Sequence, residues 1–193
     1  MAALPDDLTD APDEALLRLY ANGDGGAARA LTARHAPRVM SLAWRMLGDR
    51  TEAEDVTQEA MLRLWRVAGD WRSGEARLST WLYRVAANLC TDRLRRRRGV
   101  PLDTVPDPAD EAPGAVERLM AGDRAAALQA ALDRLPERQR LAVVLRHIEG
   151  ASNPEIAAAL ETSVEAVESL LARGRRALAA MLEGDRDKLG LDR

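Results

Sequence analysis

Apolar residues recur at intervals of three and four positions along almost the whole chain, which is the spacing of amphipathic helices. In the segment 52–68, for example, Val56, Ala60, Leu64 and Val67 fall on one side of a helix. No stretch shows a convincing alternation of apolar and polar residues, as a half-buried strand would. The pattern therefore predicts an all-α protein.

The helical pattern stops between residues 99 and 115. The segment from Gly99 to Pro113 reads GVPLDTVPDPADEAP and holds four prolines and four acidic residues. This composition sustains neither a helix nor a hydrophobic core. We interpret 99–115 as an acidic, proline-rich linker that joins two small helical domains, at 11–98 and 116–184.

Residues 152–181 carry the clearest motif of the second domain. A short helix at 152–160, a break at 161–163 and a longer helix to about residue 181 describe a helix-turn-helix, whose second helix enters the major groove of DNA. Arginine on such a helix can pair with a guanine edge or with phosphate. The outer side carries Glu165, Ser169, Ala172, Arg173 and Arg176. A helical hairpin without DNA affinity stays open as the alternative.

Local signals predict where several helices begin. Thr51, Ser152 and Thr162 each precede a glutamate by three positions, which is the capping box that satisfies free N–H groups in a first turn. Two further amphipathic segments lie around Pro136, so we expect four helices in the second domain. Their apolar residues are Leu128, Leu132, Leu135, Leu141, Val144, Leu145 and Ile148.

The helix predicted at 52–68 has an outer side of mixed character. Charged and amide groups surround one leucine there, a composition that can form a protein-docking surface. The residues are Asp55, Gln58, Glu59, Leu62 and Arg66. From the pattern alone, an ordinary amphipathic surface helix is the favoured alternative.

A loop at 69–79 leads into a strongly basic helix that ends at residue 98. One face of this helix begins with an aromatic residue and continues with an amide and cations; it consists of Trp81, Arg84, Asn88 and Arg95. Proteins hold single-stranded nucleic acid on such a cationic track with an aromatic platform. Trp71 and Arg72 in the loop are placed to capture an unstacked base. Each tryptophan taken separately is more simply a core residue.

Charge is segregated along the chain, although the net charge is only −3. Residues 79–98 contain six arginines against Asp92, and residues 103–123 contain six acidic residues against Arg118. Four consecutive arginines at 95–98 repel one another unless an anion lies near. This favours a nucleic-acid contact over a merely solvated face.

The remaining composition excludes several classes of protein. Cys90, the single cysteine, cannot form an internal disulfide; it fits a reducing cytoplasm and is expected in the core. The acidic N-terminus is not a secretory signal, and no apolar run could span a bilayer, so we expect a soluble cytoplasmic protein. The sequence shows no nucleophile–base set, phosphate-binding glycine loop or Cys/His cluster. We therefore expect no enzyme activity, no cofactor and no metal site.

Two stretches of the sequence resemble the extracytoplasmic-function (ECF) sigma factors, a family of alternative sigma factors of bacterial RNA polymerase. EAEDVTQEAMLRLWR, followed by STWLYRVAANLCTDRLRRRR, is similar to their second conserved domain. RLPERQRLAVVLRHIEGASNPEIAAALETSVEAVESLLARGRRAL, at 134–178, is similar to their fourth. The resemblance covers 14–98 and 125–182, with the two motifs in the family's order and a linker of the right kind between them.

This resemblance implies a transcription initiation factor that binds core RNA polymerase and promoter DNA, is a monomer when free, and has an anti-sigma factor as a partner. The outer residues of the 52–68 helix would face the clamp helices of the largest polymerase subunit. The −10 promoter element would be engaged by Trp71, Arg72, Trp81, Arg84, Asn88 and Arg95. The −35 element would be read by Glu168, Ser169, Ala172, Arg173 and Arg176.

The chain departs from the family pattern in its fourth domain. Glu161 stands where glycine is usual, which leaves the geometry of that turn open. Glu168 and Leu170 stand where many members carry basic residues, and a glutamate there can accept a hydrogen bond from a cytosine amino group. We therefore expect a promoter preference that differs from that of the best-known members.

Two other classes of function stay open on the sequence. A stand-alone helix-turn-helix regulator with a ligand-sensing N-terminal domain would bind duplex operator DNA as a dimer, without polymerase. The sequence shows no signature of a ligand pocket for it. An interaction protein, such as an adaptor, would lack DNA affinity, and the arginine run argues against that reading.

Overall fold

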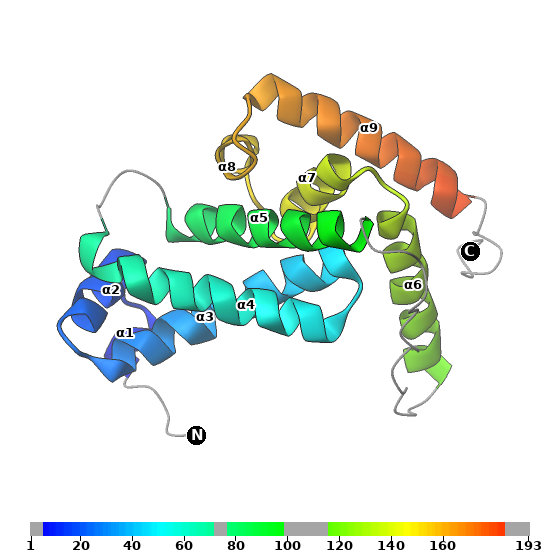
Figure 1. The fold of residues 1–193 in the computed structure, drawn as a ribbon. Coiled ribbons are helices and arrows are strands. Elements are labelled where there is room, and N and C mark those ends of the chain that lie inside the picture. Colours follow the sequence, from blue (N-terminus) through cyan, green and yellow to red (C-terminus); the bar gives the residue numbers. More distant parts are fainter. Residues whose placement is uncertain (1–5, 72–76, 99–115, 184–193) are drawn as a thin grey trace.

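The computed structural model describes residues 6–71, 77–98 and 116–183, and every regular element in these ranges is a helix (Figure 1). The N-terminal bundle consists of α1 (Asp6–Thr9), α2 (Asp13–Ala21), α3 (Gly25–Leu47), α4 (Arg50–Val67), a 3-10 turn η1 (Ala68–Asp70) and α5 (Leu78–Arg98). The C-terminal bundle consists of α6 (Val116–Asp133), α7 (Glu137–His147), α8 (Asn153–Ala159) and α9 (Val164–Glu183). The predicted all-α class is confirmed.

The N-terminal bundle is built around a hairpin of two long helices. α3 and α4 pack closely against each other, and α5 packs against both. Leu42 and Met46 from α3, Val56 and Leu64 from α4 and Leu82 from α5 are buried in the core between them. The side of 52–68 that was predicted to face inward is therefore the buried side of α4, except at Val67, which is only half-buried.

The turn between α3 and α4 determines where α4 begins. Gly48 ends α3 in the left-handed region at φ 65°, which glycine adopts without steric cost. The Asp49 side chain then accepts a hydrogen bond from the Glu52 N–H at 2.8 Å. The capping box predicted at Thr51 is therefore wrong, because Asp49 caps the helix and Thr51 already lies within its first turn.

The C-terminal bundle contains the predicted helix-turn-helix as α8 and α9. The capping box at Ser152 is confirmed, with Ser152 and Glu155 each bonding the other's backbone N–H. At the next helix the cap is one residue later than predicted, because the Ser163 hydroxyl, and not Thr162, accepts from the Ala166 N–H. Glu161 occupies the turn with φ 49°, so the turn keeps the left-handed geometry that glycine would favour.

The contact between α7 and α9 depends on the absence of a side chain at Gly174. A Cβ added at Gly174 would lie 2.7 Å from the Val143 Cγ2 atom. The two helices therefore approach more closely than any side chain at this position would allow. Gly174 thus fixes the position of α9 on the rest of the bundle.

The two bundles are in contact, and their buried residues form one continuous apolar cluster. Figure 1 shows α7 and α8 lying over α5. Arg140 on α7 is buried and donates to the backbone carbonyl of Met46 at 2.8 Å and to the Asp133 carboxylate at 2.9 Å. The predicted linker, 99–115, lies outside the described residues.

Several predictions for single residues can now be compared with their burial. Cys90 is fully buried, as predicted, and burial raises the pKa of its thiol to about 12, so it stays protonated. Trp65 is half-buried and packs against Tyr20, with the ring centroids 4.7 Å apart and the ring planes tilted by 45°. The interpretation of each tryptophan as a core residue is wrong for Trp44, whose exposed fraction is 38%.

Candidate functional site

The outer side of α4 carries the predicted docking residues together. Asp55, Gln58 and Arg66 are exposed, and Leu62 has an exposed fraction of 49%, which is large for a leucine. Glu59 accepts a hydrogen bond from Arg63 at 2.8 Å, and this bond lowers the pKa of its carboxyl. The surface is thus an ionised, partly acidic face around one exposed apolar side chain.

The predicted nucleic-acid face of α5 is present, and part of it lies under the C-terminal bundle. Trp81 is half-buried and meets Trp71 edge to face, with ring centroids 5.8 Å apart. Arg84 lies 3.7 Å from the Glu161 carboxylate of the C-terminal bundle, whereas Asn88 and Arg95 are exposed. Arg72 lies outside the described residues.

The arginine run at the end of α5 has anionic partners within the chain. Arg97 lies 2.9 Å from the Glu52 carboxylate and donates to the Leu47 carbonyl at 2.8 Å. Arg93 lies 3.5 Å from Asp55. These arginines therefore do not require an external anion for all of their charge, because Glu52 and Asp55 on α4 neutralise part of it.

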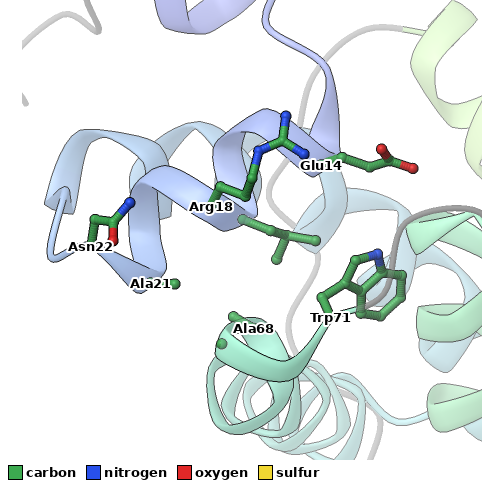
Figure 2. A pocket seen from close by; sticks show the side chains of 8 residues that line it. Glu14, Arg18, Ala21, Asn22, Ala68 and Trp71 are labelled. Carbon is green, nitrogen blue, oxygen red and sulfur yellow. The ribbon is translucent and has the colours of Figure 1, made fainter.

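A shallow pocket of about 210 Å³ opens beside Trp71, between α2 and η1 (Figure 2). Its lining consists of Glu14, Leu17, Arg18, Ala21, Asn22, Ala68, Gly69 and Trp71. Figure 2 shows the Trp71 indole close to α2, with the Arg18 and Glu14 side chains extending from that helix. An aromatic ring next to a cation, an amide and a carboxylate can hold a planar ligand that carries hydrogen-bonding edges.

α9 presents its predicted DNA face to solvent. Glu168, Ser169, Arg173 and Arg176 are exposed, and Ala172 is half-buried. The Arg173 Nε donates to the carbonyl of Ser169 at 3.3 Å, and the side chain is exposed. Sequence reasoning missed Arg175, a further exposed arginine on this helix.

Two glutamates near the start of α9, Glu165 and Glu168, differ in their hydrogen-bond partners. The pKa of Glu165 is lowered by a hydrogen bond from its own backbone N–H and by another from Ser163, so this carboxylate serves the helix start. Glu168, one turn later, makes no hydrogen bond or ion pair with any described residue. It is therefore the first free acceptor along the α9 face.

The three predicted faces do not converge on one cleft. Figure 1 shows α4 and α9 on opposite sides of α5. Sequence reasoning also missed the polar contacts between the bundles, which involve Arg38, Tyr83 and Glu149. No sequence signal relates these residues, because they lie on helices far apart along the chain.

Other kinds of site find no support among the described residues. No group of three or more His, Cys, Asp and Glu side chains is arranged to hold a metal ion in 6–71, 77–98 or 116–183. Within the same ranges, no helix combines the length and apolar character needed to cross a membrane.

Comparison with family models decides the identity of the chain. Residues 31–100 match Sigma-70 region 2, and residues 125–178 match the model for Sigma-70, region 4. The first match covers most of α3 and all of α4 and α5, and the second covers the C-terminal bundle from the middle of α6 to most of α9. Most of the predicted linker lies between the two matches. The chain is also 36% identical over 170 residues to the ECF RNA polymerase sigma factor SigM of Mycobacterium tuberculosis, covering 88% of this chain and 84% of that protein. The chain belongs to the ECF sigma factors.

Curated relatives agree with this assignment. The chain is 40% identical over 152 residues to the ECF RNA polymerase sigma factor SigE of Mycolicibacterium smegmatis, covering 77% of this chain and 58% of that protein. It is 32% identical over 187 residues to RNA polymerase sigma-H factor of Pseudomonas aeruginosa, covering 91% of this chain and 96% of that protein. This ECF sigma factor thus spans almost the whole of one relative and just over half of the other.

Solved structures share the fold of both bundles. CnrH in complex with the cytosolic domain of CnrY matches with a TM-score of 0.70 at 29% identity, covering 90% of this chain and 98% of that chain. The sigma factor RpoE in complex with the anti-sigma factor NepR from Bartonella quintana has a TM-score of 0.63 at 22% identity, covering 82% and 98%. The second of these supports the fold alone.

Proposed function

We propose that this ECF sigma factor binds core RNA polymerase through α4, engages the −10 promoter element through α5 and reads the −35 element through α9. In this proposal 11–98 is sigma domain 2, 99–115 is the linker and 116–184 is sigma domain 4. The observation that carries it is the exposure of a docking face on α4 and of a DNA-binding face on α9, in a chain with sigma regions 2 and 4. A stand-alone regulator would leave the α4 face without a role.

The α4 face supports a contact with the polymerase. Leu62 offers an apolar anchor, and Asp55, Gln58, Glu59 and Arg66 surround it with groups that can pair with charges on the partner. Interfaces of this kind bury a central apolar side chain within a polar rim. The ion pairs would set orientation and association rate more than affinity.

The −10 element would be opened by differential binding and without nucleotide hydrolysis. Asn88 and Arg95 offer hydrogen bonds and positive charge along α5, and Trp81 starts the face with an aromatic ring. The pocket beside Trp71 would take a base that has left the stack, which offsets the few kcal/mol that unstacking costs. Because the chain performs no bond-breaking step, it acts as an initiation factor and not as an enzyme.

The −35 element would be read by α9 in the major groove. Arg173 and Arg176 can grip guanine edges or phosphates, and Ser169 can donate or accept. The free carboxylate of Glu168 favours a base with an amino donor, such as cytosine. Arg175 adds a further cation for the DNA backbone, so binding at this site should weaken steeply with salt.

An anti-sigma factor is the remaining partner that we propose. The similar chain CnrH was solved in complex with the cytosolic domain of CnrY. A partner of this kind would cover α4 or the DNA faces and keep the sigma factor inactive. The site of action would be the cytoplasm, where promoter DNA and core polymerase are found.

Run-off transcription with purified core polymerase tests the proposal directly. Genomic fragments, including the region upstream of the chain's own gene, would be transcribed with and without the purified protein. We expect discrete transcripts only when the protein is present. Failure of the protein to co-elute with core polymerase and to direct any transcript would overturn the proposed function.

A further inference from the structure

The last two turns of α5 have no fully buried side chain to hold them. Cys90 is the last fully buried residue of this helix, and Leu94 is only half-buried. The next three residues are exposed arginines. Like charges one turn apart on a helix repel one another, and a helix end with little packing frays. Polar contacts must therefore hold the end of α5 that carries Arg95.

Arg97 connects this end of α5 to the turn between α3 and α4 (Figure 1). Its guanidinium donates to the Leu47 carbonyl at 2.8 Å and lies 2.9 Å from the Glu52 carboxylate. Leu47 is the last residue of α3, where carbonyls lack a partner within the helix and a cation is favourable. Glu52 lies in the first turn of α4. One side chain thus joins the ends of three helices.

The Glu52 carboxylate is oriented toward Arg97. Its Oε1 atom accepts from the Arg97 Nε at 3.2 Å. Its Oε2 atom is buried and has no hydrogen-bond partner among the described residues. Burial of a carboxylate oxygen without a partner costs free energy, and a cation next to the same carboxylate offsets this cost. Glu52 and Arg97 therefore stabilise each other.

A second contact holds the same side of α5. Arg93, one turn before Arg97, lies 3.5 Å from Asp55 on α4. Arg95 is two positions from each of these arginines, which places it about 160° around the helix from both. Asn88 lies seven positions before Arg95 and therefore shares its side of the helix. The side of α5 with Arg93 and Arg97 faces α4, and the opposite side carries two of the predicted −10 residues.

We infer that Arg97 is a positioning residue for −10 recognition. Together with Glu52 and the Leu47 carbonyl it forms a latch, which fixes the last turns of α5 on α4 and so sets the direction of Arg95. Arg97 is then not one of the cations that bind DNA, although it stands within the arginine run. Because the docking face lies on α4, the latch also fixes the angle between the two proposed binding surfaces. This inference rests on the proposed −10 recognition and adds Arg97 and Glu52 to it.

Glu52 distinguishes a latch from a simple contact between Arg97 and phosphate. An acidic residue near DNA repels phosphate, so its neutralisation by itself strengthens DNA binding. If Glu52 acts through Arg97, its neutralisation loosens the end of α5 and weakens DNA binding. The two explanations therefore predict opposite signs for the effect of Glu52→Gln.

Promoter opening by the holoenzyme measures this sign. Core polymerase saturated with the full-length chain would be titrated onto a promoter fragment, chosen by run-off transcription, that carries 2-aminopurine in its −10 element. The fluorescence of this base rises when it leaves the stack, and saturation keeps differences in polymerase affinity out of the measurement. Glu52→Gln should raise the concentration for half-maximal opening about threefold, the contribution of one exposed ion pair. Arg97→Gln should have a similar effect.

Arg97→Lys tests the shape of the side chain at constant charge. Lysine contacts phosphate as a point charge, but its ammonium lacks the planar donors that reach the Leu47 carbonyl and Glu52 together. Arg97→Lys should therefore weaken opening about as much as Arg97→Gln. At the exposed Arg96 the same exchange should stay within about twofold of wild type.

A matched substitution on α4 controls for the loss of negative charge. Glu54 is exposed and pairs with Arg50 of the same helix at 3.1 Å. Glu54→Gln makes the same change in charge as Glu52→Gln but leaves the latch intact. It should leave the concentration for half-maximal opening within about twofold of wild type.

Amide hydrogen exchange of the free chain reports on the latch without DNA or polymerase. The amides at 94–97 should exchange about threefold faster in Glu52→Gln and in Arg97→Lys than in wild type, because the end of α5 opens more often. The amide of Leu82, which lies in the core, should keep its rate.

Each outcome has a definite meaning. Weaker opening together with faster exchange, in both Glu52→Gln and Arg97→Lys, supports the latch. Unchanged or stronger opening with either variant overturns the inference, and so does weaker opening without faster exchange. The wild-type chain decides the proposed function before any variant is measured: if it neither co-elutes with core polymerase nor directs a transcript, that proposal fails and the −10 role of the latch fails with it.

Discussion

Replacing Gly174 with alanine should destabilise the C-terminal bundle, although alanine favours helices. The new Cβ would lie 2.7 Å from Val143 Cγ2 and 3.5 Å from the Gln139 carbonyl oxygen. Val143 is buried and its β-branched side chain has little freedom, so the helices must move apart. Overpacking of this kind costs about 1–3 kcal/mol. The higher helix propensity of alanine offsets about 1 kcal/mol of this cost, so the free energy of unfolding should fall by about 0–2 kcal/mol.

A double-mutant cycle with Val143→Ala separates the clash from the propensity. Val143→Ala alone removes two buried methyl groups and should cost about 1–3 kcal/mol. In the double variant the alanine methyl at position 174 enters the vacated space, so the two changes should be less than additive by about 1 kcal/mol or more. The cycle therefore measures how closely α7 and α9 approach.

Urea unfolding followed by circular dichroism is the appropriate assay. All four tryptophans precede residue 82, so tryptophan fluorescence would report on the N-terminal bundle alone. If Gly174→Ala instead stabilised the protein by about 1 kcal/mol, the full gain in helix propensity, and the two substitutions were additive, the close approach of α7 and α9 would be refuted. The position of α9 would then need another explanation.

Three further predictions concern the proposed interfaces and the N-terminal helix. Asp55→Arg should abolish co-elution with core polymerase, because it reverses a charge beside Leu62. Glu183→Arg, which makes the same change in charge, should leave co-elution intact. Equal co-elution of the two variants would reject the assignment of α4 as the polymerase-binding face. Arg173→Ala should weaken binding to a cognate −35 duplex about tenfold while polymerase binding is kept, since one good base contact is worth about 1–3 kcal/mol; unchanged run-off transcription would count against it. Burial disfavours ionisation of Asp13, but its hydrogen bonds and charge interactions with His35 and Arg34 outweigh this and lower its pKa. Wild type should therefore exceed Asp13→Asn in stability above pH 5 and lose this advantage as the pH falls below about 4; a gap that stays constant down to pH 3 in thermal unfolding would disprove the linkage.

Local patterns in the sequence are enough to predict the helices and most of their faces. The inner residues Val56, Ala60 and Leu64, the outer residues of α4 and the capping box at Ser152 all follow from contacts within four positions of the chain. Cys90 was placed correctly in the core for the same reason, since its neighbours on the helix repeat with the period of a buried stripe. The composition break at 99–115 likewise needs no tertiary information.

Which element covers each helix face depends on packing between helices that are far apart in the sequence. Periodicity shows that a helix side is apolar, but it does not show which element packs on it, so the exposure of Trp44 does not follow from the sequence. Arg140 and Met46 are 94 positions apart, and Arg38 and Glu149 are 111 positions apart, so no local pattern could pair them. Long-range contacts of this kind depend on how whole helices dock on one another. The docking of the C-terminal bundle onto α5 is such a contact, and no local pattern predicts it.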